Sequence, residues 1–157
     1  NQKTELSFAN QGVIIDGATL TGSLDLVEIV DNHITVTDYK TGKPSYSWKG
    51  KTDAEKIKLH KYRQQLMFYQ LLCNHSRDYA KYQFERGILQ FVEPDNNGEL
   101  HALEEQFSQD DLIRFTKLIN AVWHCIMTLE LPDIKEFEQN YRGVLAFEDY
   151  LIDKYSK

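Results

Sequence analysis

Alternating apolar and polar positions indicate β structure in the first third of the chain. Residues 20–30 and 33–39 both alternate and are rich in β-branched residues, with Asp31-Asn32 between them. Alternation with period two is typical of a strand with one buried face, and a short polar turn between two such runs predicts a hairpin. A shorter extended segment is predicted at 12–18, and the residues from Thr41 to Pro44 end the second strand.

The pattern then changes to apolar residues every three or four positions. Over residues 53–77 this spacing predicts an amphipathic helix, whose apolar stripe contains Leu59, Tyr62, Leu66, Tyr69 and Cys73. Asp53 is predicted to be the N-cap or an acid of the first turn. Two more strands are predicted at 84–93 and 99–107, around a turn at residues 95–98.

A second long helix is predicted from Ser108 to about Leu129, with Pro132 beyond its end. Its predicted buried side consists of Leu112, Phe115, Ile119, Val122, Trp123 and Ile126. The remainder, to Lys157, is also expected to be helical. Strands, helix, strands and helix in this order indicate an α/β fold, a central mixed β-sheet flanked by helices.

Length and composition add limits to this fold. A chain of 157 residues is long enough for one domain with a real core. No apolar run approaches the roughly 20 residues that cross a bilayer. The cysteines, Cys73 and Cys125, have no metal-binding spacing and are predicted to be buried hydrophobes, which suits a reducing, cytoplasmic setting.

The net charge of −6 argues against a free-standing DNA-binding domain, because phosphate attraction normally requires a basic surface. Two interpretations remain open. Either the chain does not bind nucleic acid, or a neighbouring domain and local metal ions provide the attraction.

The predicted hairpin brings two acids together. If Asp31-Asn32 is a two-residue turn, Asp25 lies opposite Asp38 and Ser23 opposite Lys40. Opposed residues share a face, with Cβ atoms roughly 4.5–5.5 Å apart. Two carboxylates and an ammonium are therefore predicted at one end of an apolar sheet face, which Val27, Ile29, Ile34 and Val36 continue.

Opposed carboxylates repel each other, so a cation is expected beside them. A divalent metal ion is one candidate, since Mg²⁺ prefers one or two carboxylates together with waters and phosphate oxygens. An ordinary structural ion pair with Lys40 is the alternative. Under the metal hypothesis, Asp38→Asn is expected to stabilise the metal-free protein by relieving the repulsion.

Three stretches resemble a known family. LTGSLDLVEI, ITVTDYKTGKP and YRQQLMFYQLL resemble the nuclease domain of RecB/AddA-type helicase–nucleases, a branch of the PD-(D/E)XK superfamily attached to UvrD-type helicases. The family's (D/E)-x-K corresponds to Asp38-Tyr39-Lys40, and its Q-L-x-x-Y to the segment from Gln65 to Tyr69. The resemblance implies a restriction-endonuclease-like core.

Residue by residue, the resemblance implies that Asp25 and Asp38 bind Mg²⁺ or Mn²⁺, helped by the Tyr39 carbonyl. It implies that Lys40 orients the attacking water and that Gln65 and Tyr69 position Lys40 and the DNA backbone. Tyr69 also lies on the apolar stripe, so core packing is its alternative role. The family's upstream histidine and its four-cysteine set have no counterpart here. The histidines, His33, His60, His75, His101 and His124, show no ligand spacing.

The resemblance implies a metal-dependent deoxyribonuclease that acts on DNA, single-stranded where a motor feeds it. Residues 1–157 are accordingly expected to be one nuclease domain at the C-terminal end of a larger helicase–nuclease, with helicase domains as partners. Two alternatives remain: an inactive, nuclease-like structural or DNA-tethering module, and an α/β interaction domain whose carboxylates carry no chemistry.

Overall fold

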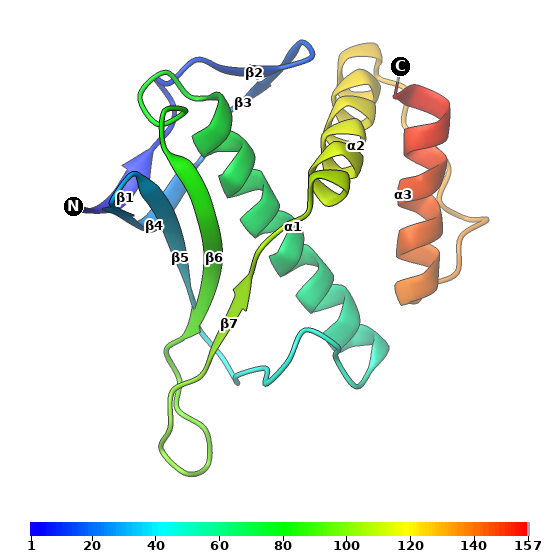
Figure 1. Ribbon diagram of the computed structural model, residues 1–157. Helices are drawn as coiled ribbons and strands as arrows, with labels where there is room; N and C mark the ends of the chain where they lie inside the picture. The colour runs from blue at the N-terminus through cyan, green and yellow to red at the C-terminus, as the bar shows by residue number, and fades with distance from the viewer. Residues whose placement is uncertain (157) are drawn as a thin grey trace.

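Five strands form one mixed sheet in the order β1-β4-β5-β6-β7 (Figure 1). The computed structural model describes residues 1–156. The sheet strands are β1 (Gln2–Ser7), β4 (Ser23–Val30), β5 (His33–Lys40), β6 (Gln83–Phe91) and β7 (Ala102–Glu105). β2 (Val13–Ile15) and β3 (Ala18–Leu20) form a separate two-stranded hairpin. This architecture confirms the predicted central mixed sheet flanked by helices.

Three helices accompany the sheet: α1 (Asp53–His75), α2 (Gln109–Thr128) and α3 (Tyr141–Tyr155). β5 and β6 pair in parallel, and α1 makes the crossover that such a pair requires. In Figure 1, α2 and α3 lie side by side beyond α1, away from the sheet. α1 is therefore the element between the sheet and the outer helices.

The core lies between α1 and the sheet. Val27, Ile34 and Val36 are fully buried, as the alternation of their strands predicted. Gly87 of β6 lets α1 approach closely, because a Cβ there would meet the side chain of Leu66 at 3.0–3.1 Å. This close contact fixes how far the face of α1 lies from the end of β5.

The predicted hairpin register is confirmed over most of its length. β4 and β5 pair from Val30–His33 to Leu26–Thr37, around a turn in which Asp31 and Asn32 have φ of 44° and 71°. Two successive positive φ values are typical of the type I′ turn that fits a two-residue hairpin. Within residues 1–156 the ladder ends at Leu26, so the two pairs expected next, Asp25–Asp38 and Ser23–Lys40, are not formed.

Several boundaries differ from the predictions. The extended run 20–30 is two strands rather than one, because β3 ends at Leu20 and β4 begins at Ser23. β1 was not predicted, and its pattern explains why: most of its residues are exposed at the sheet edge, so no alternation is visible. The first helix begins after Thr52, which is the N-cap, with Asp53 in its first turn.

α2 begins as predicted at Ser108, whose side chain forms a capping box with Asp111. Its buried side is shifted from the predicted one and consists of Leu112, Phe115, Leu118, Ala121 and Cys125. Val122 and Ile126, predicted to be buried, are 41% and 55% exposed. They line an apolar groove of about 350 Å³ between α1, α2 and β3. The apolar residues of α2 therefore include a face that the described residues do not cover.

The C-terminal region is helical over Tyr141–Tyr155 and not before it, contrary to the expectation of a helix throughout the remainder. Asn140 is the N-cap, and its side chain accepts from the Gly143 backbone N–H. Lys157 lies outside the described residues. No helix among those described is both long enough and apolar enough to span a bilayer.

Candidate active site

Four of the five predicted site residues meet where β5 ends against the middle of α1. Asp38 and Lys40 are two positions apart on β5 and therefore point to the same face. Gln65 and Tyr69 are one turn apart on α1, so they share a helix face. Asp38 is only 3% exposed, which makes its carboxylate a buried charge that needs partners.

Those partners come from both elements. Asp38 Oδ1 accepts hydrogen bonds from the Tyr69 hydroxyl at 2.7 Å and from Gln65 Nε2 at 3.1 Å. Gln65 Oε1 accepts from Lys40 Nζ at 2.6 Å. Lys40 Nζ also lies 2.7 Å from Asp38 Oδ2. The four side chains thus form a closed network in which Gln65 contacts both the acid and the ammonium.

The two oxygens of Asp38 have different surroundings. Oδ1 has two hydrogen-bond donors. Oδ2 is buried, and its partner is the Lys40 ammonium, 2.7 Å away. This ion pair compensates the negative charge on Oδ2.

Asp25 takes a position that the strand register did not predict. The β4–β5 ladder would have continued to a backbone bond at Tyr39, but the Tyr39 N–H instead donates to Asp25 Oδ2 at 2.9 Å. Asp25 therefore joins the site through its side chain rather than through strand pairing.

Tyr69 is held as a hydrogen-bond donor. Burial is the largest cause that raises the pKa of its hydroxyl far above the ordinary value, and the hydrogen bond to Asp38 adds to it. A phenol in this state keeps its proton, so Tyr69 donates to the carboxylate and does not act as a base. Core packing, the alternative role expected for Tyr69, is present, since the side chain is 7% exposed and packs in the core. Its role in positioning Lys40 and the DNA backbone stays a prediction.

One further residue, Tyr62, contacts the site, and another, Glu93, contacts the loop that follows β5. The Lys40 ammonium lies 4.5 Å from the centre of the Tyr62 ring, a cation–π distance. Glu93 Oε1 accepts from the Gly42 N–H at 2.7 Å, where Gly42 has a φ of 95° that favours glycine. Tyr62 was predicted only as an apolar residue of the helix stripe, and no pattern indicated Glu93.

The acids at this site fit a hard divalent cation. Carboxylate oxygens are the ligands that Mg²⁺ and Mn²⁺ prefer. Asp38 offers the buried Oδ2, and Asp25 Oδ1 makes no hydrogen bond within residues 1–156. Asp25 therefore keeps one oxygen free for a metal ion, whereas a metal ion at Asp38 Oδ2 would share that oxygen with the Lys40 ammonium.

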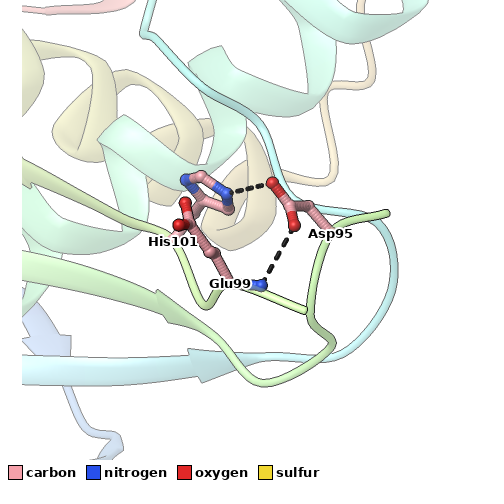
Figure 2. Close-up of side chains that lie close together, drawn as sticks. All are labelled: Asp95, Glu99 and His101. Atoms are coloured by element: carbon pink, nitrogen blue, oxygen red, sulfur yellow. Dashed lines mark hydrogen bonds and ion pairs between the residues drawn. The ribbon is translucent and has the colours of Figure 1, made fainter. Parts of the chain in front are cut away.

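A second group with metal-ligand chemistry lies in the β6–β7 hairpin, formed by Asp95, Glu99 and His101 (Figure 2). One ligand atom from each lies within 4.8 Å of the others. His101 Nε2 lies 2.8 Å from Asp95 Oδ2, and Asp95 Oδ1 accepts from the Glu99 N–H at 3.0 Å. His101 thus lies beside two acids, although the spacing of the histidines along the chain did not indicate it.

Asp95 is already engaged within its own loop. Besides Glu99, the Asn97 N–H donates to Oδ1 at 2.8 Å. The hydrogen bond with His101 is the largest cause that lowers the pKa of Asp95. These contacts are sufficient to explain the group as the element that fixes the hairpin turn. The remaining histidines contact backbone carbonyls, an aromatic ring or, for His60, the carboxylate of Glu148.

A mixed sheet with a buried Asp-x-Lys at the end of a central strand, cross-linked to a helix, is an arrangement suited to phosphodiester hydrolysis. The sequence matches the PD-(D/E)XK nuclease superfamily over residues 2–145, and the chain belongs to that superfamily. Its members are nucleases and are generally metal-dependent.

The other comparisons add little. One solved structure, titled "Crystal structure of SSO0001", is 21% identical with a TM-score of 0.43. The similarity covers 83% of this chain, which spans 60% of the length of that structure. No curated protein matches the chain.

Proposed function

We propose that this domain is a Mg²⁺- or Mn²⁺-dependent deoxyribonuclease that hydrolyses phosphodiester bonds at the Asp25, Asp38 and Lys40 site. The observation that carries the proposal is the network in which the buried Asp38 carboxylate pairs with Lys40 and Gln65 contacts both, beside the Asp25 carboxylate that reaches the Tyr39 N–H.

Each residue has a separate role in this proposal. Asp25 and Asp38, with the Tyr39 carbonyl, would hold the metal ion, which lowers the pKa of bound water and neutralises phosphate charge. Lys40 orients the attacking water and stabilises the negative charge that develops on the phosphate oxygens. Gln65 fixes Lys40 relative to Asp38, because its amide contacts both. Tyr69 holds Asp38 in place by donating to Oδ1.

We further propose that the domain belongs to the RecB/AddA-like branch and stands at the C-terminal end of a helicase that works in DNA repair or recombination. The spacing of Asp-Tyr-Lys-Thr-Gly before Gln-Leu-x-x-Tyr supports this assignment. The helicase domains would feed single-stranded DNA to the site. Both cysteines are free and buried, which suits the cytoplasm that such a protein would occupy.

Cleavage of labelled single-stranded DNA in Mn²⁺ tests the proposal. The domain, attached to its parent chain where one exists, is expected to cleave, and Lys40→Ala to reduce the rate by about 10²–10³-fold, as expected when a charge-stabilising group is removed. Lys117→Ala, an exposed lysine on α2, is the matched control. Absence of cleavage, or an unchanged rate in Lys40→Ala, would instead favour an inactive DNA-tethering module.

A further inference from the structure

Positive charge is concentrated in one segment of an otherwise acidic chain. Residues 43–63, here called the basic segment, contain seven of the 18 Lys and Arg residues and two of the 24 Asp and Glu. The segment therefore carries a net charge of +5, against −11 for the remainder of the chain. The overall charge of −6 conceals this asymmetry, which is large enough to attract a polyanion locally.

Most of these cations have no acidic partner. Among the Lys and Arg residues of the basic segment, Arg63 is the one that pairs with carboxylates of the described residues, those of Glu105 and Asp111. His60 of the same segment contacts Glu148. Its six lysines have no carboxylate oxygen within 4.0 Å among residues 1–156: Lys43, Lys49, Lys51, Lys56, Lys58 and Lys61. Unpaired ammonium groups are free to replace the counterions of a phosphate backbone.

The basic segment begins and ends at the candidate site. It starts three residues after Lys40, and its loop part runs below α1 to the start of that helix (Figure 1). The rest of the segment, residues 53–63, is the first part of α1. Lys58 and Lys61 precede Gln65 by seven and four residues, so they continue the helix face that Gln65 presents to the site. Both are exposed. A chain of phosphates leaving Lys40 would meet them in succession.

Aromatic rings lie among these cations. Tyr46 is 65% exposed, and its ring packs edge-on against His101 with centroids 4.6 Å apart. The Trp48 indole N–H donates to the Glu104 carbonyl at 2.8 Å, and Trp48 lines a hollow of about 400 Å³ together with Lys49 and Lys56. Exposed rings beside cations are the combination by which proteins stack bases and bind the backbone of a single strand.

We propose that the basic segment is a binding track for single-stranded nucleic acid, with phosphates contacting Lys58 and Lys61 and a base stacking on Tyr46. The inference rests on the proposed nuclease function, because it assigns the track to the substrate of that site. A single strand suits the track better than a duplex, since paired bases are already stacked on each other and cannot cover Tyr46.

Binding in EDTA, where no metal-dependent cleavage can occur, separates this inference from the proposed function. The probe is a fluorescently labelled 20-nucleotide single-stranded DNA, titrated by anisotropy at several salt concentrations. For Lys58→Gln/Lys61→Gln, we expect affinity to fall about tenfold at low salt. The slope of log K against log salt should decrease by about 1.4, because each single-strand phosphate contact contributes about 0.7.

Lys81→Gln/Lys117→Gln is the matched control, because it removes two exposed lysines from outside the basic segment. Tyr46→Ala should weaken binding about tenfold, and Tyr46→Phe should retain it. The inference is overturned if the control pair loses as much affinity as the Lys58/Lys61 pair, if Tyr46→Ala binds normally, or if duplex DNA binds more tightly than the single strand. A domain that binds in this way but never cleaves would support the track and contradict the nuclease.

Discussion

Two buried carboxylates, Asp38 and Glu148, receive hydrogen bonds from neighbouring glutamines of α1. Asp38 is 3% exposed and Glu148 is 7% exposed. Gln65 donates to Asp38 Oδ1, and Gln64 donates to Glu148 Oε1. The two carboxylates are thus alike in burial and in one type of partner, and any difference in their roles must come from their other contacts.

The other contacts of the two carboxylates come from different kinds of residue. Glu148 Oε1 also contacts His60 at 2.7 Å, and Oε2 accepts from Arg114 at 3.3 Å. Both of its oxygens are used, by residues of α1 and α2. Asp38 also uses both oxygens, Oδ1 with Gln65 and Tyr69 and Oδ2 with Lys40. Glu148 therefore holds the three helices together, whereas Asp38 is paired with a lysine at the end of a strand, where a second carboxylate, Asp25, bonds the Tyr39 N–H.

Asp38→Asn should have the largest effect on cleavage. An amide cannot provide the negative charge that a divalent ion requires, so we expect loss of metal binding and a fall in rate of about 10³-fold or more. The carboxylate repulsion considered from sequence predicted a more stable metal-free protein. The structure reverses that expectation, because Asp38 pairs with Lys40, and we now expect a loss of about 1–3 kcal/mol. Calorimetry with Mn²⁺ and urea unfolding measure the two effects.

Glu148→Gln should have the opposite profile. Removing the Glu148 charge leaves His60 without its acid and Arg114 with Asp149 as its remaining partner, and we expect a loss of about 1–3 kcal/mol of unfolding free energy. Cleavage by the folded fraction should be unchanged, since none of these side chains contacts the site residues. A substantial rate loss in a fully folded Glu148→Gln protein would show that the two carboxylates are not separate in function.

The pH dependence of stability sharpens the same comparison. Burial by itself would raise the pKa of Glu148, but the hydrogen bond and charge of His60 outweigh it and hold the pKa below the ordinary value. A carboxyl with a lowered folded-state pKa contributes stability that is fully present above its unfolded pKa, about 4.3. That contribution is lost as the pH falls through the folded pKa. The unfolding free energies of the wild-type protein and Glu148→Gln should thus differ most above about pH 5, and the difference should shrink as the pH falls through the lowered folded pKa.

The adjacent glutamines offer a smaller and more discriminating test. Gln65→Ala should reduce cleavage by about 10–100-fold, the usual effect of losing a group that orients a metal ligand. Gln64→Ala should leave the rate unchanged and reduce stability by about 1 kcal/mol, the value of one buried hydrogen bond. Equal rate losses in the two variants would contradict the separation of site and scaffold.

Local patterns predicted the elements better than their contacts. The Asp31-Asn32 turn and the alternation around it were sufficient for the register from Val30–His33 to Leu26–Thr37, because turn geometry fixes pairing. Periodicity did not predict which side of α2 would be covered, since Val122 and Ile126 are as apolar as their buried neighbours. Side-chain burial there depends on where α3 and α1 lie, which no local pattern contains.

In the candidate site, too, some residues could be predicted from the sequence and some contacts could not. The hairpin register led to Asp38 and Lys40, and the family resemblance led to Gln65 and Tyr69; the structure brings these four side chains together. The position of Asp25 was predicted from strand pairing, but its side chain reaches the Tyr39 N–H where the ladder has ended. Tyr62 could not be distinguished from a core residue, because its contact with Lys40 depends on how α1 crosses the sheet.

The location of bound Mn²⁺ is the most direct test of the central claim, because the structure offers two sets of ligands. Anomalous scattering from a crystal soaked in Mn²⁺ is predicted to show an ion in contact with Asp38 Oδ2 and Asp25, and to lose it in Asp38→Asn. An ion found solely at Asp95, Glu99 and His101, with none beside Asp38, would contradict the account.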